Sequence, residues 1–99
     1  MNIIELKNRL KSICEKQQVV RLDLFGSRAR SQGNDGNDYD FVVEFSDINP
    51  ADYSKRYFEL LHALEDELEA PIDLLTYGSI RKKSLKKKIA EEKVALYER

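Results

Sequence analysis

Residues 24–45 read LFGSRARSQGNDGNDYDFVVEF, and this stretch decides the fold. It begins at the end of an apolar run, residues 18–25 (QVVRLDLF), whose alternation predicts a β-strand. The apolar residues fall on both faces, with Val20, Leu22 and Leu24 on one and Val19 and Phe25 on the other. We therefore expect a strand that is covered on part of both sides.

The strand pattern breaks at Gly26-Ser27, which indicates a turn from a strand into a helix. Ser27 is a plausible cap for a short helix that runs through about Ser31. Residues 32–37 (QGNDGN) are rich in glycine and asparagine and predict a loop.

Residues 38–45 (DYDFVVEF) predict a second strand. One face carries Tyr39, Phe41, Val43 and Phe45, and the other carries Asp38, Asp40, Val42 and Glu44. Two carboxylates that are two residues apart therefore leave the same face of this strand.

The rest of the chain alternates between helical and strand patterns. We expect helices at 2–17, 51–69 and 79–91, a strand at 72–75 after Pro71, and a last short strand at 94–97. In the 51–69 helix the inward stripe comprises Tyr53, Tyr57, Leu60, Leu61, Leu64 and Leu68, and in the 79–91 helix it comprises Ile80, Leu85 and Ile89. This order predicts an α/β or α+β domain, in which helices flank a small mixed β-sheet.

Composition limits the class of protein. The 99 residues predict one domain, residues 1–99, so the specificity of an enzyme of this size would come from a partner or be loose. A net charge of −1 gives no general attraction to nucleic acid or to membranes, although residues 81–88 (RKKSLKKK) are strongly basic. Cys14 is the only cysteine, which excludes an internal disulfide. No apolar run is long enough for a membrane span, and the expected compartment is the cytoplasm.

Three carboxylates are the candidate catalytic residues. Asp73 lies between apolar residues on the 72–75 strand, and it would join Asp38 and Asp40 if the two strands are neighbours. A cluster of like charges must take up protons, gain basic partners or bind a cation. All-oxygen donors favour Mg²⁺ or Mn²⁺, and Mg²⁺ shares its ligands between carboxylates and substrate phosphates.

The turn at Gly26-Ser27 supplies candidate phosphate contacts. Gly26 permits a close backbone approach, and the free N–H groups of a helix N-terminus and the Ser27 hydroxyl can donate to phosphate oxygens. Arg28 and Arg30 are candidates to neutralise a triphosphate or the departing pyrophosphate. The sequence therefore predicts a site for a metal-complexed nucleoside triphosphate.

Gly26-Ser27, ten intervening residues and then Asp38-Tyr39-Asp40 resemble the Gly-Ser…Asp-x-Asp signature of the polymerase-beta-like nucleotidyltransferases, and residues 24–45 resemble its minimal (MNT) members. The family's third metal carboxylate falls on Asp73, and the resemblance covers nearly the whole chain. Asn37 stands where serine is common in the family, which keeps a polar side chain.

The resemblance implies the nucleotidyltransferase fold and Mg²⁺-dependent transfer of a nucleoside monophosphate from ATP or another NTP. Asp38 and Asp40 would hold two Mg²⁺ ions and Asp73 the second, with Mn²⁺ as an alternative metal. It also implies a HEPN-domain toxin as partner, with adenylylation of a toxin tyrosine by this antitoxin. Two other functions stay open: a module that masks a partner without catalysis, and nucleotide transfer to RNA. The lack of an RNA-binding domain argues against direct nucleic-acid binding.

Overall fold

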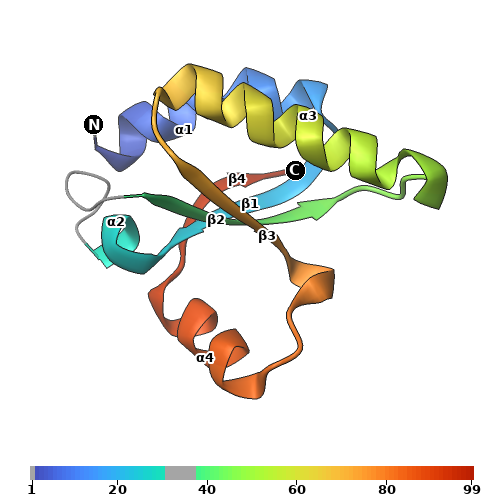
Figure 1. Ribbon diagram of the computed structural model, residues 1–99. Helices are drawn as coiled ribbons and strands as arrows, with labels where there is room; N and C mark the ends of the chain where they lie inside the picture. Colours follow the sequence, from blue (N-terminus) through green and yellow to red (C-terminus); the bar gives the residue numbers. More distant parts are fainter. Residues whose placement is uncertain (1, 31–37) are drawn as a thin grey trace.

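A four-stranded mixed sheet forms the centre of the molecule in a computed structural model that describes residues 2–30 and 38–99 (Figure 1). The elements are α1 (Ile3–Lys16), β1 (Val19–Phe25), α2 (Gly26–Arg30), β2 (Tyr39–Phe45), α3 (Pro50–Leu68), β3 (Ile72–Thr76), the 3₁₀ turn η1 (Tyr77–Ser79), α4 (Lys83–Glu92) and β4 (Val94–Glu98). The strand order is β3-β2-β1-β4, with β2 parallel to β3 and β1 antiparallel to both neighbours. The predicted fold class, helices around a small mixed sheet, is confirmed.

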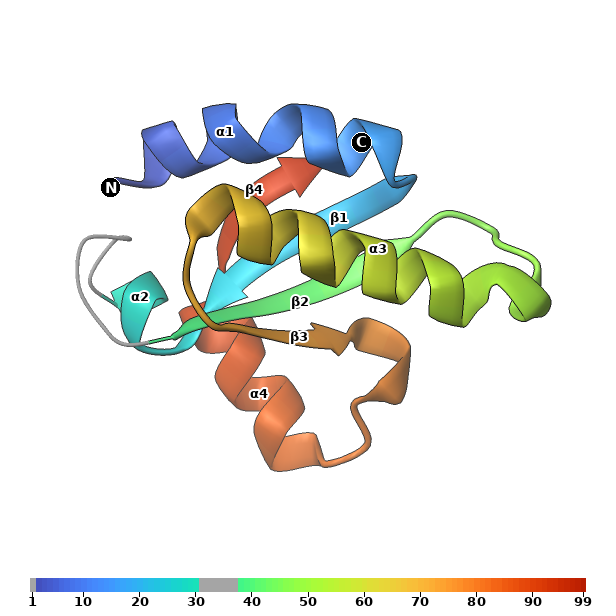
Figure 2. The ribbon, with the colours of Figure 1, turned by 45° about the horizontal axis from the view of Figure 1, so that its top comes forward.

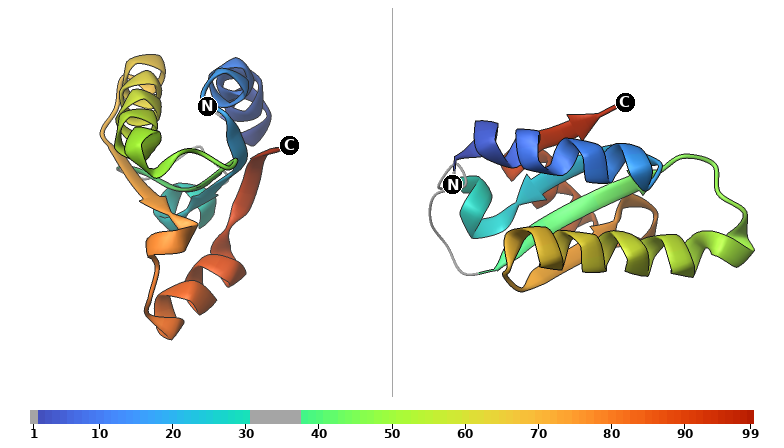
Figure 3. Two further views of the ribbon diagram at one scale, coloured as in Figure 1. Left: turned by 90° about the vertical axis from the view of Figure 1, so that its right-hand side faces the viewer. Right: turned by 90° about the horizontal axis from the view of Figure 1, so that it is seen from above.

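Helices cover both faces of the sheet. α1 and α3 lie side by side on one face, and α4 lies on the other (Figures 1, 2 and 3). α2 lies at the end of the sheet where β1 finishes and β2 begins. The chain therefore has two apolar layers, and the α4 layer is the smaller one.

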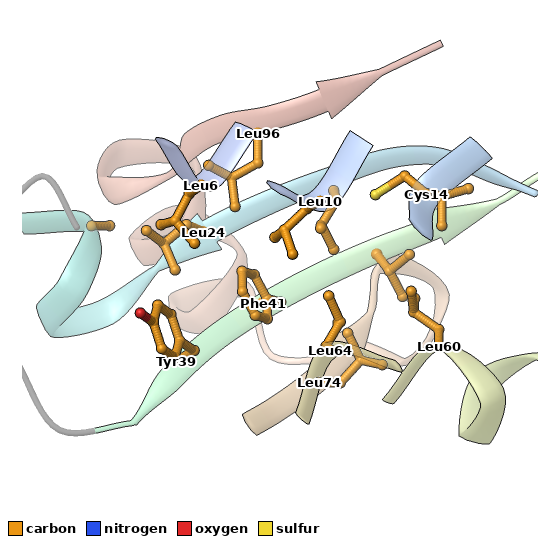
Figure 4. Close-up of a cluster of buried hydrophobic side chains, with 14 residues drawn as sticks. Leu6, Leu10, Cys14, Leu24, Tyr39, Phe41, Leu60, Leu64, Leu74 and Leu96 are labelled. Atoms are coloured by element: carbon orange, nitrogen blue, oxygen red, sulfur yellow. The ribbon is translucent and has the colours of Figure 1, made fainter. Parts of the chain in front are cut away.

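The main core fills the space between the sheet and the α1/α3 pair (Figure 4). Its fully buried members include Leu6 and Leu10 of α1, Phe41 of β2, and Leu60 and Leu64 of α3. Burying each such side chain contributes about 1.5–3 kcal/mol, so this layer supplies most of the apolar stabilisation. The second layer packs Val42 of β2 against Ile80 and Ile89, with Phe25, Leu75, Tyr77 and Leu85 around them.

Local sequence sets the ends of the two long helices. The Asn2 side chain accepts a hydrogen bond from the Glu5 N–H at 2.9 Å, and the Asn49 side chain accepts one from the Ala51 N–H at 3.0 Å. Each asparagine thereby satisfies a backbone donor that the first helical turn leaves unpaired. α3 ends at Glu69, whose φ of 49° is left-handed and turns the chain toward β3.

The structure corrects several details of the sequence-based expectation. A register shift in β1 between Val19 and Arg21 places Val19 in the main core with Leu22, instead of on the opposite face. The basic helix starts at Lys83 and not at residue 79, because η1 precedes it. Tyr53, expected in the core, is 39% exposed. The short strand expected at the C-terminal end is confirmed as β4, whereas the loop predicted at 32–37 lies outside the described residues.

Cys14 is a buried member of the main core. Burial, with a smaller contribution from Glu15, raises the pKa of its thiol to about 12. The thiol is therefore protonated at neutral pH and a poor nucleophile. Among the described residues, no helix combines the length and the apolar character that crossing a membrane requires.

The layer between the sheet and α4 contains a buried carboxylate, Asp23, that was not among the candidate residues. Asp23 of β1 is fully buried and accepts a hydrogen bond from the Arg21 Nε at 2.8 Å and another from the Tyr77 hydroxyl. Burial and the bond to Asp23 raise the pKa of Tyr77, so this hydroxyl is protonated and remains a donor at neutral pH. This hydrogen bond connects η1, which directly precedes the α4 segment, to the inner strand β1.

We expect Tyr77→Phe to lower the free energy of unfolding by about 1–3 kcal/mol, because the buried carboxylate of Asp23 then loses one of its two charge-assisted hydrogen bonds and keeps only the bond from Arg21. Chemical denaturation monitored by circular dichroism measures this loss. Tyr97→Phe removes a hydroxyl from a half-buried tyrosine outside this network and is the matched control. Equal stabilities of the two variants would show that the Tyr77–Asp23 bond adds nothing.

Candidate functional site

Two of the candidate carboxylates face each other across neighbouring strands. Asp40 of β2 and Asp73 of β3 are directly paired in the parallel register, and Asp38 precedes β2 by one residue. Their strand positions alternate with the main-core residues Tyr39, Phe41 and Leu74, so they belong to the face of the sheet that α4 covers. The neighbouring strands on which the prediction depended are therefore present.

The electrostatics of Asp40 show that the three carboxylates act on one another. Partial burial raises the pKa of Asp40, and the negative charges of Asp73 and Asp38 raise it further. Arg30 and Lys88 oppose this rise, because a nearby positive charge favours the ionised form. Burial and the two neighbouring carboxylates together therefore outweigh the two basic groups, and the ionised form of Asp40 is disfavoured.

Gly26 packs directly against the Asp40 carboxylate. Its φ of +74° lies in the left-handed region, which side chains other than glycine rarely adopt. A Cβ atom added at this position would lie 2.3 Å from Asp40 Oδ2. The pairing of Phe25 with Asp40 in the sheet produces this close approach, because it brings the start of the turn next to the carboxylate.

The turn after Gly26 differs from the expected capped helix. α2 begins at Gly26, so Ser27 lies in its first turn, and the helix has only five residues. A helix this short adds little macrodipole. Any attraction of this turn for an anion must therefore come from its backbone N–H groups, the Ser27 hydroxyl and nearby basic side chains.

The two arginines of α2 lie in different surroundings. Arg30 forms an ion pair with Glu92 of α4 at 2.7 Å and is one of the two basic groups that act on Asp40. Arg28 has its guanidinium carbon 3.8 Å from the ring centre of Tyr39, a residue of the opposite face. The structure thus brings Arg30 to the carboxylates, whereas Arg28 contacts the main-core side.

We expect Arg30→Ala to reduce nucleotide transfer by about tenfold, the effect of losing roughly 1.4 kcal/mol of charge stabilisation. Arg28→Ala should reduce it by less, and should instead lower thermal stability through the lost contact with Tyr39. Steady-state rates and melting curves of the two variants check this contrast. A larger activity loss for Arg28→Ala would contradict the placement.

Lys88 is a candidate site residue that sequence reasoning missed. It lies four residues before Glu92, so the two share one flank of α4, and the Glu92–Arg30 pair orients this flank toward α2. Its charge acts on Asp40. The only signal in the sequence was the run of basic residues 81–88, which does not reveal which side chain turns toward the sheet.

The donor chemistry of the three aspartates fits a divalent metal ion. Their oxygens suit Mg²⁺ or Mn²⁺, and a bound cation would offset both the burial and the neighbouring negative charges that raise the pKa of Asp40. In residues 2–30 and 38–99, no group of three or more His, Cys, Asp or Glu side chains is arranged to hold an ion as it stands. Repulsion between carboxylates opposes such gathering unless a cation offsets it.

Comparisons with known proteins find relatives that match most of the chain. The family model described as a nucleotidyltransferase domain matches residues 6–96. A Methanocaldococcus jannaschii protein named "putative protein adenylyltransferase" is 37% identical over 87 residues, covering 88% of this chain and 86% of its own. Another protein of that name and organism is 36% identical over 97 residues, covering 95% of this chain and 97% of its own.

Solved structures show the same fold. One described as a putative minimal nucleotidyltransferase has a TM-score of 0.73 at 24% identity and covers 95% of both chains. One of the Shewanella oneidensis tri-AMPylated HEPN toxin in complex with its MNT antitoxin has a TM-score of 0.67 at 18% identity, covering 98% of this chain and 73% of that one. A toxin–antitoxin complex with AMP-PNP has a TM-score of 0.69 at 19% identity, covering 94% and 73%. With the family model spanning most of its length, this chain belongs to the nucleotidyltransferase domain family, the enzyme class that its Gly-Ser…Asp-x-Asp spacing predicted.

Proposed function

We propose that this enzyme transfers AMP from MgATP to a hydroxyl group of a protein partner, and that the acceptor is a tyrosine of a HEPN-domain toxin. The observation that carries the proposal is the pairing of Asp40 with Asp73 on parallel strands, with Gly26 packed on Asp40 and Arg30 and Lys88 nearby. This arrangement combines an all-oxygen donor set with basic groups for phosphates. A nucleoside triphosphate complexed to a divalent ion needs both.

The proposed roles follow from the placement of the side chains. Gly26 and Ser27 bind the triphosphate through backbone N–H groups and the hydroxyl, since a glycine at this position leaves room for phosphate beside the carboxylates. Asp38, Asp40 and Asp73 hold Mg²⁺. When bound, the metal neutralises phosphate charge and orients the phosphates for in-line displacement. Two ions are the proposed number, with Mn²⁺ as a substitute.

In the proposed reaction the acceptor hydroxyl oxygen forms a bond to the α-phosphorus of ATP. The bond from that phosphorus to the β-phosphate bridging oxygen breaks, and pyrophosphate leaves. Asp73, exposed at the edge strand β3, takes the proton of the acceptor hydroxyl. Arg30 and Lys88 stabilise the charge that develops on the departing pyrophosphate, which is the usual role of basic groups in phosphoryl chemistry.

The identity of the acceptor rests on what the relatives and neighbours are described as doing. The curated relatives are named for adenylyl transfer to protein, and one solved neighbour contains an AMPylated HEPN toxin beside an MNT antitoxin. We extend both descriptions to this chain, with ATP as the donor of the nucleotide. We further propose that residues 1–99 form one catalytic domain. Its proposed compartment is the cytoplasm, and neither nucleic acid nor a membrane is proposed as a direct partner.

The test uses ATP labelled in the α-phosphate, Mg²⁺, the full chain and the protein product of a HEPN-domain toxin gene. We expect label on the partner protein, and mass spectrometry should locate it on tyrosine. Asp38→Ala with Asp40→Ala should abolish the transfer, whereas Asp47→Ala with Asp66→Ala, a matched pair of exposed aspartates away from the site, should leave it intact.

Two results would contradict the proposal. One is the absence of label transfer by the wild-type chain, and the other is transfer that survives the Asp38/Asp40 double substitution. If the double variant still neutralises the partner without transferring label, the chain acts by masking its partner and not by catalysis.

A further inference from the structure

A small apolar pocket lies on the flank of α4 that is turned away from the carboxylates. Its volume is about 240 Å³, and it is lined by Tyr77, Ile80, Lys86, Ile89, Ala90 and Lys93. Sites for drug-sized ligands start at about 300 Å³, so this pocket is too small for a nucleotide but large enough for one apolar side chain. Aliphatic residues make up much of its lining, and two lysines lie at its margin.

Helical geometry separates this pocket from the candidate catalytic site. Lys86 and Lys88 are two residues apart, which places them about 200° apart around the helix axis. Lys88 acts on Asp40, whereas Lys86 lines the pocket. Since a helix with its side chains is about 10 Å across, anything bound in the pocket would lie roughly one helix diameter from the catalytic flank.

The flank with the pocket is strongly basic. Lys83, Lys86 and Lys93 recur at spacings of three and seven residues and so lie on the same side of α4 as Ala90. Including residues just before α4 and on its other sides, six basic residues of the 81–88 segment are exposed, namely Arg81, Lys82, Lys83, Lys86, Lys87 and Lys88. None of the six forms an ion pair with a carboxylate in the described part of the chain. Exposed cations that form no ion pair with any residue of 2–30 or 38–99 are available to a ligand of opposite charge.

The charge of the remaining chain decides which polyanion fits. Residues 81–88 hold six of the 17 basic residues, so the other 91 positions carry 11 basic and 18 acidic side chains, a net charge of −7. A long nucleic acid would run from the basic flank onto a negatively charged surface. A short acidic protein segment can be confined to the flank, and an apolar residue within it can fill the aliphatic pocket.

We propose that this flank of α4 docks an acidic segment of the acceptor protein and takes one apolar side chain of that segment into the pocket between η1 and α4. The inference rests on the proposed function, because it assumes that a protein accepts the nucleotide. Docking here would hold the acceptor about one helix diameter from the flank that carries Lys88, and so raise the local concentration of its hydroxyl at the carboxylates.

Binding to defined peptides tests the docking surface itself. The probes are a peptide of one leucine flanked by three glutamates on each side, the same peptide with serine for leucine, a version with lysines for the glutamates, and oligouridylate. We expect NMR amide shifts of the ¹⁵N-labelled full chain to gather in residues 77–93 with the first peptide. Serine should weaken binding by about tenfold, the effect of losing one buried leucine side chain.

Two variants challenge the two components of the surface. Lys83→Glu with Lys86→Glu reverses the charge, and Ala90→Phe fills the pocket from an exposed position. Each should weaken the acidic leucine peptide by about tenfold. Lys7→Glu with Lys11→Glu on α1 and Ala51→Phe on α3 are matched controls at exposed sites and should bind it as the wild type does. Shifts outside residues 77–93, tighter binding of oligouridylate, or no effect of either α4 variant would overturn the proposal.

Kinetics with the HEPN-domain product separate this inference from the proposed function. Both α4 variants should raise the KM for the acceptor protein by about tenfold and leave the KM for ATP unchanged. If the wild type transfers no label but the peptide shifts map to α4, the docking surface stands and the proposed function falls. If label is transferred and the acceptor KM is unchanged in both variants, the docking surface falls and the proposed function stands.

Discussion

Asp40→Asn is expected to reduce nucleotide transfer by at least about 1,000-fold, the upper range for the loss of a single charge-stabilising group in a catalytic site. Asp40 is the carboxylate on which Asp38 and Asp73 both act, and the only one of the three that is partly buried. Asparagine keeps the shape of the side chain but removes the negative charge that a divalent cation needs. Label transfer under saturating ATP and acceptor measures this loss.

The same substitution should stabilise the metal-free protein at neutral pH. The pKa of Asp40 is raised in the folded state relative to the unfolded chain, where it is about 3.9. The contribution of Asp40 to the free energy of unfolding is therefore fully present below about pH 3.9 and is lost as the pH rises through the folded pKa. Asparagine does not ionise and escapes this loss. Relief of about 1 kcal/mol of like-charge repulsion would raise the melting temperature by about 4 °C in a domain of this size.

Melting curves recorded from pH 3 to pH 8 check the sign of this effect. The difference between the variant and the wild type should be small below about pH 3.9 and should grow as the pH rises through the folded pKa. Saturating Mg²⁺ with ATP should reverse the order, because ligands stabilise the state that binds them and only the wild type keeps the full carboxylate set. A variant that is active, or that is less stable than the wild type at neutral pH without metal, would contradict the role given to Asp40.

Gly26→Ala is expected to have the next largest effect, a loss of about 100-fold in nucleotide transfer, which is the cost of displacing a catalytic group by about 1 Å. The added Cβ would lie 2.3 Å from Asp40 Oδ2, so the carboxylate or the turn must move. The left-handed backbone at φ +74° adds about 1–2 kcal/mol of strain for alanine. Activity and stability should therefore fall together, in contrast to Asp40→Asn.

Gly78→Ala is the matched control for this prediction. Apart from Gly78 and its two chain neighbours, none of the described residues has an atom within 4 Å of a Cβ built at Gly78, and its φ is not in the left-handed region. Its stability should stay within about 0.5 kcal/mol of the wild type, and its transfer rate should be unchanged. Circular dichroism spectra of Gly26→Ala will show whether the variant is folded. A folded Gly26→Ala with the wild-type rate would remove Gly26 from the site.

Two features of β1, the buried Asp23 and the register shift near Val19, were not predicted from the sequence. For Asp23 the sequence did contain a signal. Asp23 lies between apolar residues in RLDLF, and a carboxylate on a strand that is covered on both sides must have hydrogen-bond partners in the interior. The β1 register shift that turns Val19 into the main core left no such signal. A bulge depends on pairing with two neighbouring strands, and pairing is a long-range property that local alternation does not encode.

The sequence by itself determined the elements and the identity of the candidate site. Periods of two and 3.6 residues are set by backbone geometry, so DYDFVVEF predicted a strand with Asp38 and Asp40 on one face, and the position of Gly26-Ser27 ten residues earlier predicted the family. Only the tertiary structure decided what meets this face. The parallel pairing of β2 with β3 puts Asp73 opposite Asp40. The packing of α4 determines that Lys88, one of six exposed basic residues, and Arg30 instead of Arg28 are the basic groups that act on Asp40. These neighbours come from distant parts of the chain and are brought together because both faces of the sheet are buried by helices. A local sequence pattern does not specify such long-range contacts.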